Sequence, residues 1–321
     1  MATKFKIYVV RPARDFLLYH IIYSLFSLGR FANRKMLLKW HGSLAVLVYS
    51  LTKKTRKAIA SNLETAFGPS SDPQVYDNMG KKLFSCLGKT LTDYSLFSKM
   101  KTKDQFSKYF TFEGEENLQK AYNRGKGVLC MVVHTPGWEF SAIMPPILGY
   151  PTLGVSSRIK NPAINRLMID MRESRGMKNI TRDRCYEILM NELSMGKCLI
   201  IMIDQDSMNI RGEFLKFFGK DAYTPIGCAR LVQETGAALV PMYTVRNEST
   251  DTYTFKMLPE VPFETKETDI ETYRYNTQKY NDVIESIIRE NPIQWVWMHN
   301  RWKTTPETLQ KFLDKKKQCN K

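Results

Sequence analysis

Two runs of apolar residues, each ending in a residue that can accept a proton, constrain the fold of this chain most. They read GVLCMVVH (127–134) and KCLIIMID (197–204). Strands buried on both faces of a parallel sheet have this near-continuous apolar character. Further strands are expected at 237–246 and 252–258, and helices at 139–148, 162–174, 183–194 and 225–235. The pattern predicts an α/β fold, with a mostly parallel central sheet flanked by helices on both faces.

The polar residues that close the two runs are His134 and Asp204. In open α/β sheets, ligands bind outside the carboxyl ends of the strands. Two polar groups placed alike on separate strands therefore suggest a shared crevice at that edge of the sheet.

A carboxylate, Glu139, lies five residues after His134 in the segment HTPGWE. On a continuous helix this spacing would separate the two side chains by about 140°. The Pro136-Gly137 dipeptide breaks the path, so His134 can end the strand while Glu139 opens the next helix and folds back. Glu139 would then fix one imidazole nitrogen, and the other would accept a proton from a hydroxyl nucleophile. The alternative is a satisfied histidine at a strand end and a glutamate favoured by the dipole of its helix.

The positive charge of the chain is concentrated near its beginning. The formal net charge is +16, and residues 1–60 hold twelve lysines and arginines against one acid, Asp15. Two apolar stretches, 16–29 and 40–52, lie among these charges. Each is about 20 Å long as a helix, against roughly 30 Å of bilayer hydrocarbon. We expect 1–60 to form helices that lie on an anionic membrane, and 61–321 to form the α/β domain. Ordinary core helices with solvated charges, or one tilted span, are the alternatives.

The sequence favours neither a metal nor a cofactor. The six cysteines are scattered without a C-x-x-C pair, which indicates reduced, mostly packed thiols in a cytosolic compartment. Asp204 and Asp206 would suit a divalent cation, but no third carboxylate or histidine lies close in sequence.

Aromatic and basic residues mix in WVWMHNRWKT (295–304). No recognisable nucleic-acid motif accompanies them, so nucleic acid is not an expected partner.

Several motifs, weak singly but strong in their order and spacing, extend along nearly the whole chain. They are NLETAFG (62–68), HTPGWE (134–139), SSRIKNP (156–162), DQD with FFG (204–219), TPIGCARLVQETGA (224–237) and WVWMHNRWKT (295–304). With them the chain resembles the late acyltransferases of lipid A biosynthesis, the lauroyl and myristoyl transferases, within the glycerolipid acyltransferase superfamily. The resemblance implies an enzyme that moves a fatty acyl chain from an acyl-carrier-protein thioester to a hydroxyl of a lipid A precursor. It also implies a place at the cytoplasmic face of the inner membrane, held by anionic lipids.

The resemblance implies roles for individual residues as well. His134 would be the general base and Glu139 the group that orients it. Arg158 would bind substrate, because a guanidinium in the loop before a helix can hold a phosphate or a carbonyl oxygen through two hydrogen bonds.

Three further residues would contact the substrate. Asp204 and Asp206 would bind sugar hydroxyls or orient a nearby basic residue. Arg301 lies among three tryptophans, and aromatic residues beside cations are typical where a protein meets lipid head groups. Basic patches would also serve to dock the acidic acyl carrier protein.

The chain departs from the family pattern at Pro136-Gly137, where Gly-Asn is expected. This leaves the acceptor open, and a lysophospholipid, another glycolipid or an ornithine lipid is an alternative to the lipid A precursor. A catalytically silent protein that binds a membrane surface is the alternative from a different functional class. Intact His134, Glu139, Arg158 and Asp204 argue against it.

Overall fold

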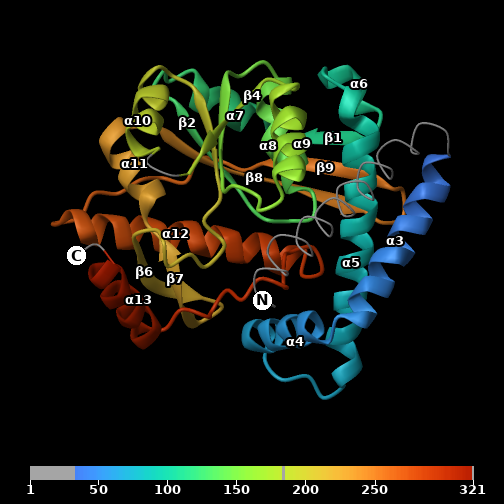
Figure 1. Ribbon diagram of the computed structural model, residues 1–321. Coiled ribbons are helices and arrows are strands. Elements are labelled where there is room, and N and C mark those ends of the chain that lie inside the picture. Colours follow the sequence, from blue (N-terminus) through green and yellow to red (C-terminus); the bar gives the residue numbers. More distant parts are fainter. Residues whose placement is uncertain (1–32, 183–184, 320–321) are drawn as a thin grey trace, which may run out of the picture.

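A seven-stranded sheet forms the centre of the computed structural model, which describes residues 33–182 and 185–319 (Figure 1). The strand order is β1-β9-β8-β2-β5-β3-β4, and all neighbours are parallel except β8 and β9. The strands are β1 (Phe110–Glu113), β2 (Val128–Val132), β3 (Thr152–Ser156), β4 (Met177–Thr181), β5 (Cys198–Ile201), β8 (Ala238–Asn247) and β9 (Thr252–Met257). A separate antiparallel hairpin consists of β6 (Gly212–Phe217) and β7 (Lys220–Pro225). The mostly parallel sheet agrees with the sequence prediction.

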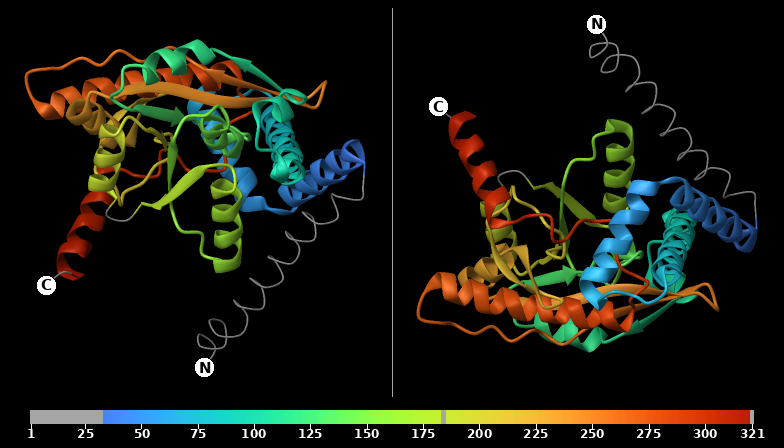
Figure 2. Two further views of the ribbon diagram at one scale, coloured as in Figure 1. Left: turned by 90° about the horizontal axis from the view of Figure 1, so that it is seen from above. Right: turned by 90° about the horizontal axis from the view of Figure 1, so that it is seen from below.

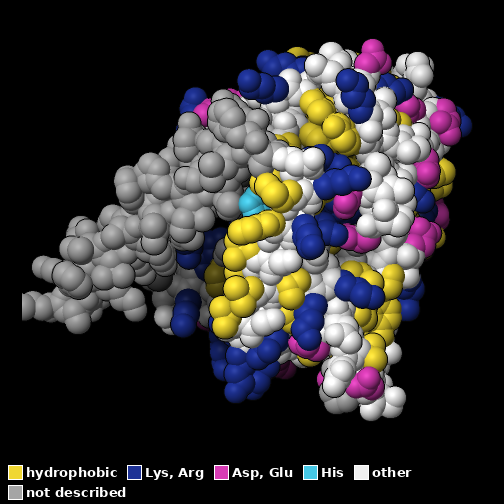
Figure 3. Space-filling view, turned by 90° about the vertical axis from the view of Figure 1, so that its right-hand side faces the viewer, with side chains coloured by type: hydrophobic (Ala, Val, Ile, Leu, Met, Phe, Trp, Pro, Cys, Tyr) yellow, Lys and Arg dark blue, Asp and Glu magenta, His cyan; other side chains and the backbone are white. Residues whose placement is uncertain are grey.

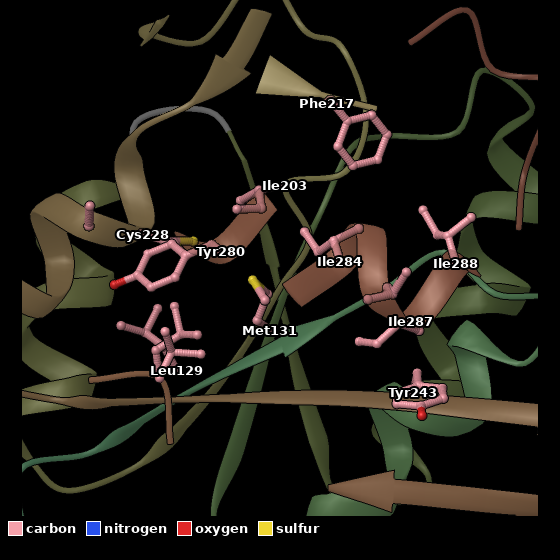
Figure 4. Close-up of a cluster of buried hydrophobic side chains, with 14 of the residues drawn as sticks. Leu129, Met131, Ile203, Phe217, Cys228, Tyr243, Tyr280, Ile284, Ile287 and Ile288 are labelled. Carbon is pink, nitrogen blue, oxygen red and sulfur yellow. The ribbon is translucent and has the colours of Figure 1, made fainter. Parts of the chain in front are cut away.

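Helices cover both faces of this sheet, as the side chains of β2 show. Leu129 and Met131 belong to one core cluster, shared with α10 (Tyr186–Ser194), α11 (Gly227–Thr235) and α12 (Asp269–Glu290) (Figure 4). Cys130 and Val132 belong to a second cluster, shared with α7 (Glu115–Tyr122), α8 (Trp138–Ile147) and α9 (Pro162–Glu173). Successive side chains of a strand point to opposite faces. The sheet is therefore the middle of three layers, and the predicted fold class is confirmed.

Local sequence signals place α9 where it was expected. Asn161 accepts hydrogen bonds from the backbone N–H groups of Ala163 (3.0 Å) and Ile164 (3.1 Å), and Pro162 is the first helical residue. Both residue types are favourable at the start of a helix. The loop between β3 and α9 is thereby held at the carboxyl edge of the sheet.

Three helices near the start of the described chain, α3 (Arg34–Leu51), α4 (Lys53–Phe67) and α5 (Pro73–Leu96), lie at one side of the sheet (Figures 1 and 2). α3 and α5 cross closely, since a Cβ added to Gly88 would come within 2.5 Å of the carbonyl oxygen of His41. Ile59 and Leu63 of α4 are fully buried in the cluster around β2. The expected boundary at residue 60 thus falls inside α4, which packs with the α/β domain.

A buried ion-pair network fixes α3 and α5 to the sheet. Asp93 in α5 has no exposed surface, and its carboxylate contacts Arg34 (2.7 Å) and Arg246 of β8 (2.8 Å). Removing one partner from a buried pair leaves an uncompensated charge, so such a network holds its elements firmly in place. The contact joins α3 and α5 to strand β8 of the sheet.

Within residues 33–182 and 185–319, no helix is both long enough and apolar enough to cross a membrane. The second of the two apolar stretches, 40–52, lies almost entirely in α3. The first, 16–29, lies outside the described residues. The remaining helices of the described residues are the short α6 (Lys103–Ser107), a 3-10 turn at Phe97–Lys99 and α13 (Pro306–Cys319). α13 projects from the body of the molecule (Figure 2).

Candidate active site

His134 and Asp204 meet at the carboxyl edge of the sheet, as the two apolar runs predict. They follow β2 and β5, which are parallel neighbours with Met131 paired to Ile201. The ring Nδ1 of His134 lies 2.5 Å from Oδ1 of Asp204, and the backbone N–H of His134 donates to Oδ2 at 2.8 Å. Nδ1 of the ring is thereby held, which leaves Nε2 as the free imidazole nitrogen.

Asp204 is completely buried, and its second oxygen also accepts a hydrogen bond from the indole N–H of Trp295 at 2.9 Å. Burial raises the pKa of this carboxyl group, but the facing His134 and the hydrogen bonds from His134 and Trp295 outweigh burial, so the pKa lies below its usual value. Asp204 is therefore an ionised acceptor at neutral pH and orients the imidazole.

The structure corrects the predicted pairing of His134 with Glu139. Glu139 lies in the first turn of α8, and both its oxygens accept from Arg172 of α9, at 2.9 and 2.6 Å. The indole N–H of Trp138 donates to the same carboxylate at 3.1 Å. The partner of His134 comes instead from the neighbouring strand, 70 residues away in sequence. Glu139 is thus an ion-pair partner of Arg172 within the same site.

Asp206 and His299 attach the C-terminal segment to this edge of the sheet. The backbone N–H and hydroxyl of Thr304 donate to Asp206 at 3.0 and 2.7 Å, and the backbone N–H of Asp206 donates to Nε2 of His299 at 3.0 Å. Burial, then Lys303, lower the pKa of His299 to about 4. A neutral ring can accept the hydrogen bond that is observed. Both carboxylate oxygens of Asp206 accept from Thr304, and Asp206 also lines the cavity around His134, so its contact with substrate stays a prediction.

The two predicted substrate-binding arginines differ in position. Arg158 is exposed in the loop between β3 and α9 and is not among the residues that line the cavity around His134, so its role stays a prediction. Arg301 has no exposed surface; its guanidinium donates to the carbonyl of Tyr223 (2.7 Å) and to Oγ1 of Thr224 (2.5 Å). Burial lowers the pKa of Arg301 to about 10. These two bonds hold the β6–β7 hairpin, and the predicted role of Arg301 in binding substrate stays a prediction.

Replacing Arg301 with methionine should lower the free energy of unfolding by about 2–4 kcal/mol. The buried carbonyl of Tyr223 would lose its guanidinium donor, and Oγ1 of Thr224 would keep only the hydrogen bond from Asn281 at 3.2 Å. The rate of the folded fraction should stay within about twofold of wild type. Thermal unfolding and activity assays normalised to folded protein would check this. A variant as stable as wild type but with a raised KM would support a role of Arg301 in substrate binding.

Two cavities meet at Trp138 and Glu139, which line both of them. The larger, about 840 Å³, contains His134, Arg172 and polar side chains including Ser157, Asn179, Gln205, Ser207 and Asn209. The smaller, about 550 Å³, lies between α3, α5, α8 and α9 and is mainly apolar, with walls that include Leu44, Val48, Leu87, Leu91, Ile164 and Leu167. Both sizes suit a bound organic ligand. The arrangement can hold a polar group at His134 and a hydrocarbon chain beside it.

In the part of the chain that the structure describes, no group of three or more histidine, cysteine or acidic side chains is placed to hold a metal ion. The chemistry that the site offers is proton transfer at Nε2 of His134. The sequence analysis did not identify Arg172 as a site residue, because Arg172 lies within an ordinary helical pattern and belongs to no motif. Trp295 belonged to a recognised motif, but nothing in its sequence position indicates a contact with Asp204.

The chain matches a protein-family model described as bacterial lipid A biosynthesis acyltransferase over residues 3–304. It is 28% identical over 265 residues to a lipid A biosynthesis palmitoleoyltransferase from Escherichia coli, covering 79% of this chain and 80% of that protein. It is 23% identical over 262 residues to a lipid A biosynthesis acyltransferase from Haemophilus influenzae, covering 81% and 79%. It is also 25% identical over 191 residues to a phosphatidylinositol mannoside acyltransferase from Mycolicibacterium smegmatis, covering 58% and 60%.

Proposed function

Because the chain belongs to the bacterial lipid A biosynthesis acyltransferase family, we propose that it transfers a fatty acyl group from an acyl-carrier-protein thioester to a hydroxyl of a lipid A precursor. The observation that carries the chemistry is the contact between His134, which lines the larger cavity, and the buried Asp204. Asp204 holds Nδ1, so Nε2 accepts the proton of the acceptor hydroxyl as its oxygen attacks the thioester carbonyl. The imidazolium that forms is stabilised by the adjacent carboxylate.

Attack on the thioester creates a tetrahedral oxyanion that needs hydrogen-bond donors. α8 begins at Trp138, four residues after His134, and its N-terminus has no side-chain cap. The backbone N–H groups of a first helical turn and the helix dipole both favour negative charge. We assign oxyanion stabilisation to this turn rather than to Arg158, which lies outside the cavity lining. Expulsion of the carrier thiolate, which takes the proton from His134, completes the transfer.

A covalent acyl-cysteine intermediate has no support in this geometry. Five cysteines of the described residues are buried and are not in disulfide bonds: Cys86, Cys130, Cys185, Cys198 and Cys228. Cys228 lines the larger cavity, but burial raises the pKa of its thiol to about 12. A thiol with this pKa is protonated near neutrality and a poor nucleophile. Direct transfer from the thioester to the hydroxyl is the simpler route.

The direct test is an assay with purified protein, acyl-acyl carrier protein and a lipid A precursor, followed by mass spectrometry of the lipid product. Transfer should add one acyl group to the lipid and release free carrier thiol. Lipids from cells with and without the protein should differ by the same mass. No acylated lipid in either assay would refute the proposed acceptor, and acylation of a mannosylated or lyso-phospholipid instead would establish the alternative acceptor. The similarity to a phosphatidylinositol mannoside acyltransferase is the reason to include a mannosylated lipid among the acceptors tested.

The exposed side chains of α3 support binding of the protein to a membrane surface. Five apolar side chains recur every three or four residues along it, and between 47% and 76% of each is exposed: Met36, Trp40, Leu44, Leu47 and Leu51. Exposed hydrophobic side chains gather beside lysines and arginines on this side of the molecule (Figure 3). Lys35 and Lys39 in α3 and Lys53, Lys54 and Lys57 in α4 are exposed. An apolar helical stripe next to lysines is typical of a helix that lies in an anionic membrane interface.

Changing Trp40, Leu47 and Leu51 together to serine should convert a protein that leaves membranes only with detergent into one that leaves with high salt. Apolar insertion resists salt, whereas the remaining lysine contacts are screened by it. Activity should fall more on membrane-embedded acceptor than on detergent-dispersed acceptor. The matched control changes Ile188 and Met195, which are 45% and 62% exposed on and after α10, to serine. If both variants stay bound and active, the stripe of α3 is not the membrane contact.

A further inference from the structure

Two motifs of the sequence that the proposed mechanism leaves unexplained meet in the structure. NLETAFG (62–68) lies at the end of α4, and WVWMHNRWKT (295–304) follows α12. The side-chain amide of Asn62 donates to the backbone carbonyl of Trp297 at 2.7 Å and to that of His299 at 2.8 Å. Asn62 is only 3% exposed, so its amide donors are satisfied inside the protein. Through Asn62, α4 holds the backbone of the second motif.

The segment 295–304 bonds in turn to the loop that follows β5. The indole N–H of Trp295 donates to Oδ2 of Asp204 at 2.9 Å. Two residues later, the backbone N–H of Asp206 donates to His299, and the carboxylate of Asp206 accepts from Thr304. The carboxylate that orients His134 is therefore held by a residue that lies 91 positions further along the chain.

The indole of Trp295 is held rigidly. Trp295 has no exposed surface, and its ring lies 4.7 Å from that of Trp297 in an edge-on contact and 5.8 Å from that of Phe217. A carboxylate, in contrast, rotates easily about its Cβ–Cγ bond. Oδ2 of Asp204 accepts from this fixed indole and from the backbone N–H of His134. The two donors fix the plane of the carboxylate and point Oδ1 at the imidazole.

We propose that Trp295 is a positioning residue for the pair of His134 and Asp204, and that Asn62 keeps Trp295 in place through the segment 295–304. The inference rests on the proposed function for the reaction that this pair carries out. Neither Trp295 nor Asn62 is among the residues that line the two cavities at the site. Loss of either side chain should therefore lower kcat and leave KM unchanged, because the effect reaches the substrates only through the imidazole.

The alternative is that the bond of Trp295 serves stability alone, because a buried indole N–H needs an acceptor wherever it lies. Trp297 provides the comparison. It is 1% exposed, and its indole N–H donates to the carbonyl of Pro292 at 2.7 Å instead of to Asp204. A purely structural role predicts similar consequences when either indole N–H is removed, whereas the positioning role predicts a loss of kcat for Trp295 alone.

Trp295→Phe removes the N–H group and keeps an aromatic ring in the core. The value of kcat should fall about tenfold, the effect of one lost hydrogen bond to a charged group in the transition state. KM for both substrates should stay within about twofold. Trp297→Phe should lower the temperature of thermal unfolding by a similar amount and keep kcat within about twofold. Equal losses of kcat in the two variants, or a raised KM with unchanged kcat in Trp295→Phe, would refute the positioning role.

Asn62→Leu tests the connection through α4. It should lower kcat about threefold with KM unchanged, and it should cost little further in the Trp295→Phe background, since the two residues act in series. Asn276→Leu is the matched control. Asn276 has no exposed surface, and its amide donates to the backbone carbonyls of Glu264 and Thr272 at 2.7 and 2.8 Å. A loss of kcat as large in the control, or additive losses in the double variant, would remove Asn62 from the proposal.

Nuclear magnetic resonance of the full-length protein in detergent decides the contact without any substrate. The indole signal that disappears in Trp295→Phe belongs to Trp295. It should shift in Asp204→Asn, and in Asn62→Leu it should shift and exchange faster with deuterium, whereas Asn276→Leu should leave it in place. An unchanged signal in Asn62→Leu or in Asp204→Asn would overturn the proposal even if both variants were slow. If wild-type protein acylates no lipid, the proposed function fails, while this signal still decides whether Trp295 and Asn62 hold Asp204.

Discussion

Replacing His134 with alanine should lower the rate of acyl transfer by about 10²- to 10⁴-fold, the usual contribution of a general base. The imidazole of His134 lines the larger cavity, and its Nδ1 is fixed by Asp204 at 2.5 Å, which leaves Nε2 to take up the proton of the hydroxyl. Without it, the acceptor hydroxyl would have to attack the thioester while still protonated. KM for both substrates should change little, since the loss falls on the transition state.

The measurement is single-turnover transfer from acyl-acyl carrier protein to the lipid acceptor, with thermal unfolding as the check on folding. The His134 side chain is only 18% exposed and packs near Trp138, so a small decrease in stability is expected. His134→Gln, which keeps a polar side chain of similar size, should be as inactive as the alanine variant. A rate within tenfold of wild type in a folded variant would remove His134 from the chemistry.

Replacing Asp204 with asparagine should cost about 10³- to 10⁴-fold in kcat, because an amide can hold the imidazole in the wrong tautomer and cannot stabilise the imidazolium. The pKa of Asp204 is lower than usual, so the carboxylate stays ionised and contributes stability at neutral pH. This contribution is lost only as the pH falls through the folded-state pKa. The variant should therefore lose activity and stability together at pH 7, and its stability should depend less on acid pH than that of wild type.

The double variant His134→Ala, Asp204→Asn should be little slower than His134→Ala alone, since the two residues act as one unit. Glu139→Gln is the informative comparison, because Glu139 bonds Arg172 and not His134. It should lose less activity than Asp204→Asn and should instead loosen the contact between α8 and α9. Independent, additive losses for His134 and Asp204, or a larger loss for Glu139→Gln than for Asp204→Asn, would contradict the assignment of Asp204 as the orienting group.

Much of the architecture could be predicted from the order of residue types alone. Apolar runs without alternation identify β2 and β5 as strands buried on both faces, and every residue of β2 is indeed buried. Asn161 and Pro162 mark the start of α9 because capping and a fixed φ are local effects. The polar residues that end the two runs indicate the functional edge, since parallel strands bring their carboxyl ends to one side of the sheet. These features depend on neighbours within a few residues, which the sequence specifies directly.

The partners within the site were decided by the tertiary structure. His134 bonds Asp204 and not Glu139, because β5 lies next to β2 in the sheet although β3 and β4 lie between them in sequence. Arg301 is buried against the β6–β7 hairpin, a position that its mixture of aromatic and basic neighbours does not reveal. Hydrogen-bond partners and burial depend on strand order and on contacts between distant segments. Periodicity and composition do not contain that information, whereas the packed sheet does.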